Sequence, residues 1–91
     1  MSVLDNEHTP RYVISVAARL VSLPVHMLRS YEKANLIKPS RTSGNIRLYS
    51  DADIALLRRI AELDKQGINK AGIRMILDLE KKAGAQEDLS Q

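Results

Sequence analysis

The sequence predicts one mostly α-helical domain, a winged helix-turn-helix with a short β-hairpin wing and two further helices. Three observations favour this fold class. Two short amphipathic segments flank residues 22–24 (SLP), and a proline placed there ends one helix but fits the first turn of the next. Residues 43–45 (SGN) separate two β-prone runs, and Gly and Asn tolerate the positive φ of hairpin turns. Residues 51–80 then carry apolar side chains at helical spacing.

Length and composition limit the class of protein. The 91 residues suffice for one domain, and 44% apolar with 27% charged residues is typical of a globular chain. The chain has no cysteine, which excludes disulfides and thiolate metal sites and fits a reducing compartment. It has neither a secretion-type N-terminus nor an apolar run of the roughly 18 residues that a membrane span needs. We therefore expect a cytoplasmic protein.

Positive charge is concentrated in the middle of the chain. Residues 11–50 carry seven basic residues and one acid, a net charge of +6. Residues 1–10 carry a charge of −2, and residues 51–91, with seven basic and eight acidic residues, carry −1. This asymmetry is typical of a nucleic-acid-binding part joined to a near-neutral supporting part.

The N-terminal part is expected to contain a polar tail, an edge strand and the first helix. Residues 1–10 are polar, and we expect them to be disordered. Residues 11–14 (RYVI) are β-prone, and Ser15 stands where an N-cap would begin the first helix. The side chains at helical spacing that should face the core are Val16, Leu20 and Leu23.

The second helix, residues 25–34, has an apolar face and a face rich in hydrogen-bond donors. The side chains expected to face the core are Val25, Leu28 and, beyond the helix, Leu36. The donor-rich face carries His26, Arg29, Ser30 and Lys33. In a helix-turn-helix the second helix enters the major groove of DNA, where such donors reach base edges. A plain pair of antiparallel helices has similar periodicity but no need of this face.

The wing is expected to be a hairpin between residues 36–38 (LIK) and residues 46–49 (IRLY), which alternate with period two. Arg41 and Arg47 flank its tip, where they would straddle the DNA backbone or enter the minor groove. The alternative for both arginines is that they are solvated surface charges that contact no DNA. Peripheral candidates for phosphate contact are Lys38 and Lys70.

Capping signals mark the two further helices. Ser50 is a good N-cap, and Asp53 can complete a capping box for a helix that ends before Gly67. Asn69 caps a fourth helix, which should stop where the apolar pattern ends and leave residues 81–91 as a polar tail. The side chains expected to face the core are Ile54, Leu57, Ile60, Ala61, Leu63, Ile73, Ile76, Leu77 and Leu79.

Other kinds of chemistry find little support in the sequence. The two histidines, His8 and His26, are too few and too far apart to predict a metal site. There is no glycine-rich phosphate loop, nucleophile motif or zinc-protease motif. Asp51 and Asp53 form an acid pair, but they lie where a helix begins, and capping explains them. We expect neither an enzyme nor a cofactor.

Four stretches of the sequence resemble MerR-type transcriptional regulators. They are residues 12–20 (YVISVAARL), 24–32 (PVHMLRSYE), 41–54 (RTSGNIRLYSDADI) and 67–73 (GINKAGI). The residues that match the family's recognition helix and wing are Leu28, Arg29, Tyr31, Glu32, Arg41, Gly44, Arg47 and Tyr49. The resemblance covers residues 12–80, and the wing together with the entry to the fourth helix makes it fairly specific.

This resemblance implies a transcription factor that binds an inverted repeat in double-stranded DNA, as a homodimer in its full-length context. By position, Arg29 and Tyr31 would contact the duplex from the second helix, and Arg41 and Arg47 from the wing. Arg29 can bind guanine in a bidentate manner or contact a phosphate, and the sequence leaves both open. Tyr49 would pack at the wing base with its hydroxyl on a phosphate, whereas Tyr31 suits the core equally well.

Within the family, the sequence is most similar to heat-shock repressors, which repress chaperone operons and can use a DnaK-type chaperone as corepressor. The alternatives are nitrogen-type regulators, which share the wing and the fourth-helix entry, an architectural excisionase-like protein and a protein-interaction module. Residues 23–27 and Ser30 depart from the heat-shock pattern where bases would be read, so the target sequence stays open. Family dimers form through a long helix after the fourth, so this chain is either a shortened form or dimerises differently.

Overall fold

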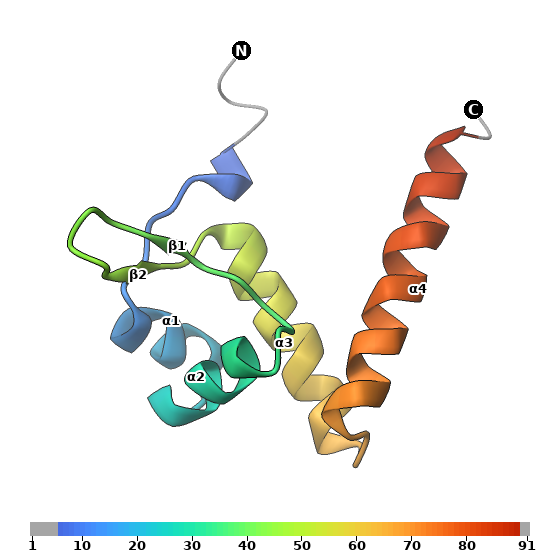
Figure 1. The fold of residues 1–91 in the computed structure, drawn as a ribbon, viewed down its shortest axis with the longest axis horizontal. Helices are drawn as coiled ribbons and strands as arrows, with labels where there is room; N and C mark the ends of the chain where they lie inside the picture. The colour runs from blue at the N-terminus through green and yellow to red at the C-terminus, as the bar shows by residue number, and fades with distance from the viewer. Residues whose placement is uncertain (1–5, 90–91) are drawn as a thin grey trace.

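The computed structural model describes residues 6–89, the last five of them for the backbone only. Within these residues, four α-helices accompany one two-stranded antiparallel hairpin (Figure 1). In chain order the elements are α1 (Ile14–Val21), α2 (Val25–Lys33), β1 (Ser40–Arg41), β2 (Arg47–Leu48), α3 (Asp51–Lys65) and α4 (Lys70–Leu89). The mostly helical winged helix-turn-helix predicted from the sequence is confirmed.

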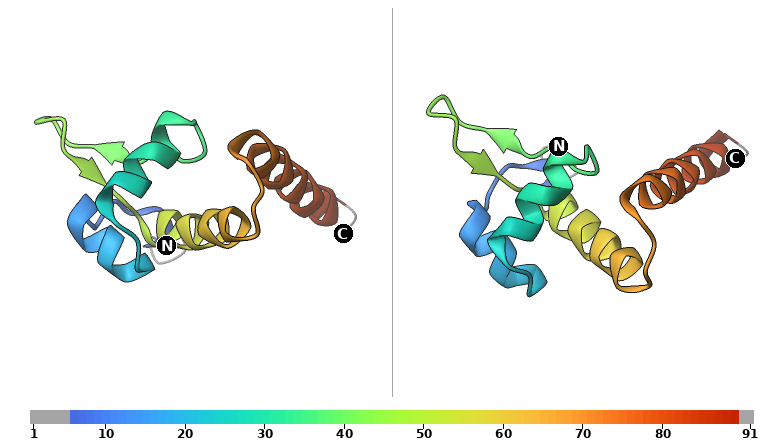
Figure 2. Two further views of the ribbon diagram at one scale, coloured as in Figure 1. Left: turned by 90° about the horizontal axis from the view of Figure 1, so that it is seen from below. Right: turned by 60° about the horizontal axis from the view of Figure 1, so that its bottom comes forward.

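The helix-turn-helix and the wing are assembled on α3. Helix α1 packs against both α2 and α3, and the hairpin lies beside the start of α3 (Figure 1). Helix α4 packs against α3 and projects away from α1 and α2 (Figures 1 and 2). The buried apolar side chains form one cluster of Ala17, Ala18, Leu28, Tyr31, Leu36, Ile37, Tyr49, Ile54, Leu57, Ile60, Leu63 and Ile73. This core holds the surfaces of α2 and the wing in a fixed relation.

The capping signals of α3 and α4 act as the sequence predicted. The Ser50 hydroxyl accepts a hydrogen bond from the Asp53 N–H at 3.1 Å, and the Asp53 carboxylate accepts one from the Ser50 N–H at 2.9 Å. This reciprocal pair satisfies two of the N–H groups left free at the start of a helix. The side-chain carbonyl of Asn69 likewise accepts the Gly72 N–H at 2.8 Å at the start of α4.

Helices α1, α2 and α3 all end in the same way. The residue after each last turn adopts positive φ: Ser22 (59°), Asn35 (62°) and Gly67 (87°). The following N–H then bonds back over five residues, to the carbonyls of Ala18, Tyr31 and Leu63 respectively. The donors of these bonds are apolar residues, Leu23, Leu36 and Ile68. A left-handed cap of this kind turns the chain sharply and returns an apolar side chain toward the helix.

The start of the domain differs from the prediction. Helix α1 begins at Ile14 with Val13 as its N-cap, so Ser15 lies inside the helix and caps nothing. Instead of an edge strand at residues 11–14, Tyr12 forms an isolated antiparallel bridge with Tyr49. Its N–H and C=O bond Tyr49 at 2.9 and 2.7 Å. The Arg11 N–H also donates to the Tyr49 carbonyl, at 3.0 Å, so three backbone bonds anchor the N-terminal segment to the wing without a continuous ladder.

The core face of α1 also differs from the prediction. Val16 and Leu20 are 41% and 42% exposed, whereas Ala17 and Ala18 are buried. Small side chains let a helix approach its neighbours closely, and α1 packs on α2 and α3 together. The periodicity predicted that the larger side chains, Val16 and Leu20, would face the core, but both are exposed.

The first strand of the wing lies later in the chain than predicted. Strand β1 is Ser40–Arg41, not residues 36–38, and Arg41 pairs directly with Arg47. Leu36 is unavailable for a ladder because its N–H completes the left-handed cap of α2 and its side chain is buried. At the hairpin tip, Asn45 rather than Gly44 adopts positive φ, at 65°.

Helix α4 is longer than the apolar pattern predicted. It continues to Leu89, although we expected it to stop after residue 80. Residues 81–89 include Ala, Lys, Gln and Glu, which favour helix without needing a buried face. Leu79, expected in the core, is 60% exposed, whereas Ile73 is fully buried. No helix in the described part of the chain is long and apolar enough to cross a membrane.

The N-terminal tail lies only partly within the described residues. Positions 1–5 fall outside them, and residues 6–8 form a short turn of 3₁₀-helix. The Thr9 N–H closes this turn on the Asn6 carbonyl at 3.1 Å.

Candidate nucleic-acid interface

The exposed face of α2 presents three cationic or donor side chains in a row. His26, Arg29 and Lys33 are exposed, and Ser30 beside them is half-buried. At about 100° per residue, these positions fall within one arc of roughly 100° around the helix. The helix is fixed from behind by the fully buried Leu28. The structure therefore places these sequence-predicted residues together on one surface.

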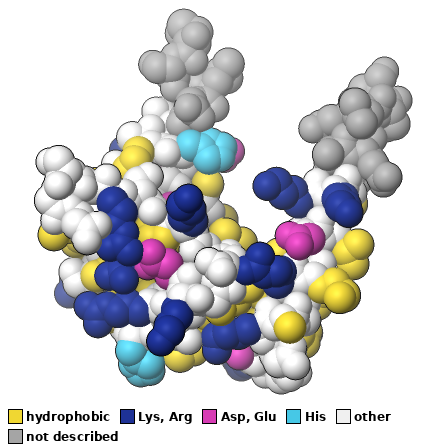
Figure 3. All heavy atoms as spheres, in the orientation of Figure 1, with side chains coloured by type: hydrophobic (Ala, Val, Ile, Leu, Met, Phe, Trp, Pro, Cys, Tyr) yellow, Lys and Arg dark blue, Asp and Glu magenta, His cyan; other side chains and the backbone are white. Residues whose placement is uncertain are grey.

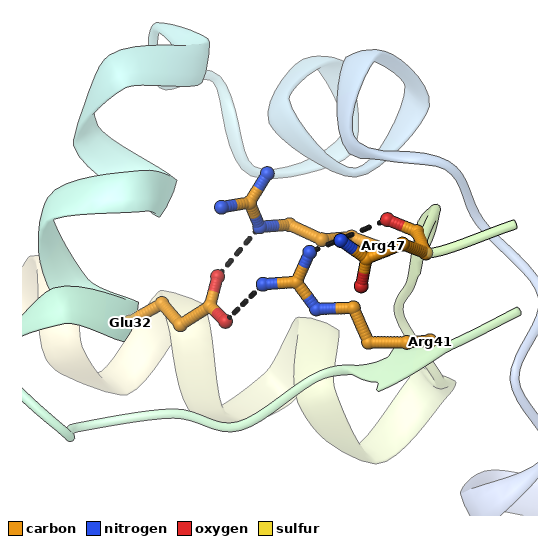
Figure 4. Close-up of polar contacts among 4 residues, drawn as sticks. Glu32, Arg41 and Arg47 are labelled. Carbon is orange, nitrogen blue, oxygen red and sulfur yellow. Dashed lines mark hydrogen bonds and ion pairs between the residues drawn. The ribbon is translucent and has the colours of Figure 1, made fainter.

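The wing arginines lie against the C-terminal turn of α2, joined to it by Glu32 (Figure 4). Arg47 Nε donates a hydrogen bond to Glu32 Oε1 at 2.6 Å, and an Arg41 terminal nitrogen donates to Oε2 at 2.7 Å. A second terminal nitrogen of Arg41 reaches the Asn45 carbonyl at the wing tip, at 3.4 Å. One carboxylate thus joins α2, β1 and β2.

The environment keeps the Glu32 carboxyl ionised. Burial opposes its ionisation, but the hydrogen bonds and charges of Arg47 and Arg41 outweigh burial and hold its pKa below the ordinary value. The two arginines keep their charges, so the group of three carries a net +1. The wing therefore remains cationic although both arginines are paired.

We call the surface made by His26, Arg29, Lys33, Arg41 and Arg47 the basic face. Its two parts are contiguous because Glu32, which holds the wing arginines, directly precedes Lys33 in α2. Figure 3 shows Lys and Arg side chains gathered over α2 and the hairpin, with an acidic group among them. Such a surface suits a polyanion of elongated shape.

The two tyrosines of the resemblance support the basic face from behind and are not part of it. Tyr31 is 1% exposed, and its hydroxyl donates to Asp64 of α3 at 2.8 Å. Burial, together with the bond to Asp64, raises the pKa of Tyr31 far above its ordinary value. Tyr49 is fully buried at the wing base, as expected, but its hydroxyl is buried too. Neither hydroxyl is placed at the surface where a phosphate would bind.

The peripheral lysines are both exposed, at different places. Lys38 lies in the loop between α2 and the wing, and Lys70 is the first residue of α4. One turn later, Arg74 donates to the carbonyls of Ala34 and Asn35 at 3.0 and 2.8 Å. Arg74 therefore ties the start of α4 to the C-terminal end of α2.

Two contributors were not assigned a role from the sequence. Glu32 is the only acid among residues 11–50, and a lone acid between arginines is a signal that could have identified it. Arg74 gave no such signal. Its bonds join the start of one helix to the end of another, and only the tertiary fold brings these residues together. Both act on the position of α2 or the wing.

The remaining polar groups have structural roles. Asp51 accepts a hydrogen bond from the Tyr12 hydroxyl at 2.7 Å and pairs with Arg11 at 3.6 Å. Asp53 completes the capping box, so each of the two acids has a structural partner. Within the described residues, no three His, Cys, Asp or Glu side chains are grouped as a metal ion would require.

Comparisons with known proteins agree on one family. The model of the MerR HTH family of regulatory proteins matches residues 12–80. The putative heat shock protein HspR of Streptomyces coelicolor is 51% identical over 75 residues, which are 81% of this chain and 50% of HspR. The transcriptional regulator GlnR of Bacillus cereus is 40% identical over 73 residues, 80% of this chain and 57% of GlnR. The chain thus spans about half the length of these curated relatives.

Solved structures show the same fold. A MerR-family transcriptional regulator from Bacillus cereus matches 86% of this chain and 66% of its own, with 30% identity and a TM-score of 0.66. PbrR691 from Ralstonia metallidurans, solved with lead(II), matches 80% of this chain and 58% of its own, with 26% identity and a TM-score of 0.73. HiNmlR, solved on promoter DNA, matches 87% of this chain and 62% of its own, with a TM-score of 0.73; at 23% identity this is a likeness of fold.

Proposed function

This chain belongs to the MerR HTH family of regulatory proteins, and on that basis we propose that it binds double-stranded DNA with sequence preference and regulates transcription. The observation that carries the proposal is the basic face. A donor-rich helix surface and two wing arginines lie side by side on a chain segment with a net charge of +6. A helix of this kind fits the major groove, and a wing beside it reaches the sugar-phosphate backbone.

The residues of the basic face divide into two proposed roles. Arg29, midway along α2 and exposed, reads base edges, since a guanidinium can bind guanine O6 and N7 together. His26 and Ser30 adjoin it and are the further candidates for base contacts. Arg41 and Arg47 contact the backbone, which supplies affinity with little sequence information.

We propose that the DNA site is an inverted repeat bound by two copies of the protein. Two identical helix-turn-helix units related by a two-fold axis require half-sites related in the same way. Helix α4 supports this proposal, because Met75 and Leu79 on its outer side are 66% and 60% exposed. Large apolar side chains exposed in this way are typical of contact surfaces.

The proposed regulatory role is repression of heat-shock or chaperone genes, with a DnaK-type chaperone as a corepressor. The 51% identity to the heat shock protein HspR supports this choice over a GlnR-type role, for which the identity is 40%. Mapping the genomic sites of the bound protein tests it. Sites at chaperone promoters would support heat-shock control, and sites at nitrogen-assimilation promoters would establish the alternative.

Selection of bound duplexes from a random-sequence library tests DNA recognition itself. We expect an enriched inverted repeat, and an unenriched pool would contradict sequence-specific binding. On the selected duplex and on a shuffled duplex, Arg29→Ala should reduce the preference between them, whereas Arg47→Ala should weaken both alike. Lys81→Ala is the matched control, because it removes one exposed positive charge from α4. If Arg29→Ala and Arg47→Ala each weaken binding to the selected and the shuffled duplex by the same factor, this division of roles is refuted.

A further inference from the structure

The wing contains an arrangement that is unfavourable on its own. Arg41 and Arg47 are direct partners across the β1–β2 ladder. Directly opposed residues of an antiparallel pair project to the same side, and like charges there repel. The two strands have only two residues each, so the ladder contributes little to hold them. Another group has to fix these two guanidinium groups.

Glu32 is that group. Each of its carboxylate oxygens binds one arginine, at 2.6 and 2.7 Å, and its side chain is only 21% exposed. The carboxylate comes from α2, so it orients the wing relative to the helix that carries Arg29. A bond made at one edge of a guanidinium leaves the other donors pointing in a set direction.

The arginines retain free donors while they are held. Within the described residues, the two terminal nitrogens of Arg47 make no hydrogen bond, and Figure 4 shows them directed away from Glu32. Arg41 uses its two terminal nitrogens on Glu32 and Asn45, and its Nε makes no bond among these residues. The paired arginines can therefore still donate to DNA phosphates.

We propose that Glu32 is a positioning residue for DNA binding, which holds Arg41 and Arg47 in the orientation that the DNA backbone requires. The inference rests on the DNA-binding function proposed above. The positioning role predicts a change in DNA affinity opposite in sign to the change that simple electrostatics predicts. An acid next to a polyanion should weaken binding, so its removal should strengthen binding. If Glu32 orders two arginines in advance, its removal weakens binding, because DNA must then order two free side chains.

The test compares DNA affinity of Glu32→Gln with wild type by fluorescence anisotropy on the selected and the shuffled duplex. We expect about a tenfold loss on both duplexes, from the cost of ordering two arginine side chains. The slope of log Kd against log salt should not decrease, since both arginines still reach phosphates. Arg47→Ala, which removes a contact, should reduce that slope by about 0.9. Asp78→Asn on α4 is the matched control for loss of one exposed negative charge.

A double-mutant cycle distinguishes positioning from any other role. In an Arg41→Ala, Arg47→Ala background, Glu32→Gln should change the affinity by less than about twofold. A Glu32→Gln protein that binds as tightly as wild type or more tightly, or that loses affinity equally in this background, would overturn the inference. A wild-type protein that does not bind DNA would instead overturn the proposed function.

If circular dichroism shows that the Glu32→Gln protein is unfolded, a shorter acid at this position provides a second variant. Glu32→Asp keeps the charge but shortens the reach by one methylene, so it cannot hold both arginines as Glu32 does. We expect weaker DNA binding than wild type by several-fold. A folded Glu32→Asp protein with unchanged affinity would also overturn the inference.

Discussion

The hydroxyl of Tyr31 separates a packing role from a DNA-contacting role, and Tyr31→Phe tests which one it has. The side chain is 1% exposed, and the hydroxyl donates to Asp64 of α3 at 2.8 Å. Phenylalanine keeps the ring in the core and removes only the hydroxyl. Because the pKa of Tyr31 is raised, by burial first and then by Asp64, the phenol is neutral and donates this bond at pH 7. The substitution therefore removes one hydrogen bond between α2 and α3.

The size of the effect follows from the surroundings of the bond. A hydrogen bond to a charged acceptor contributes about 1.5–3 kcal/mol in proteins. Asp64 is only half-buried, so its carboxylate can bind water once the hydroxyl is gone. We therefore expect Tyr31→Phe to lower the free energy of unfolding by about 1 kcal/mol. For a domain of this size, that corresponds to a fall in Tm of roughly 4–8 °C.

Urea unfolding at pH 7 gives the stability change, and Asp64→Asn provides the control. The double variant should lose less than the sum of the two single variants, since both remove the same bond. DNA affinity of Tyr31→Phe, measured at a temperature where both proteins are folded, should stay within about twofold of wild type. Unchanged stability together with a several-fold loss of DNA affinity would refute the core assignment and make Tyr31 a DNA contact.

Three further changes have expected outcomes. Ser22→Gly should raise the free energy of unfolding by about 0.5 kcal/mol in urea denaturation, because Ser22 adopts a φ of 59° that costs a side chain more than glycine; a loss of stability would contradict this. Arg74→Met keeps the apolar stem but removes both bonds to the end of α2, and should cost about 0.5–1 kcal/mol by the same assay. Burial raises the pKa of Glu32, but the hydrogen bonds and charges of Arg47 and Arg41 outweigh burial, so the pKa in the folded protein is lowered. The free energy that these ion pairs contribute to folding is therefore present above the ordinary carboxyl pKa of about 4.3. It is lost as the pH falls through the lower folded value. The difference in unfolding free energy between wild type and Glu32→Gln should therefore shrink from pH 7 to about pH 3, and a constant difference would exclude the ion pairs as its source.

The sequence predicted those elements whose signals are local. The capping box of Ser50 and Asp53, the αL residue Gly67 and the cap by Asn69 each depend on a few neighbouring residues, and each is found. Helical periodicity located the buried residues of α3 because that helix is long and lies against the rest of the core. In the short α1, the same periodicity favoured Val16, which is exposed.

The features that the sequence did not predict depend on the tertiary fold. A two-residue strand has no periodicity, so β1 could not be distinguished from the β-prone residues 36–38, of which Leu36 and Ile37 are buried in the core instead. Residues 81–89 carry no apolar stripe in the sequence, so their polarity was interpreted as the end of the helix, although α4 continues to Leu89. In the candidate interface, the cationic residues were predicted, but the role of Glu32 was not, because its arginines are 9 and 15 residues away in sequence.

The dependence of DNA affinity on salt tests the central claim most directly. The wild-type protein is titrated onto a labelled duplex at several salt concentrations, and Kd is followed by fluorescence anisotropy. If the basic face binds the DNA backbone, log Kd rises linearly with log salt, with a slope of about 0.9 for each phosphate neutralised. Lys33, Arg41 and Arg47, each on one phosphate, together predict a slope of about 2.7 for each copy bound. A flat line, or no binding at low salt, would contradict the assignment of this face to DNA.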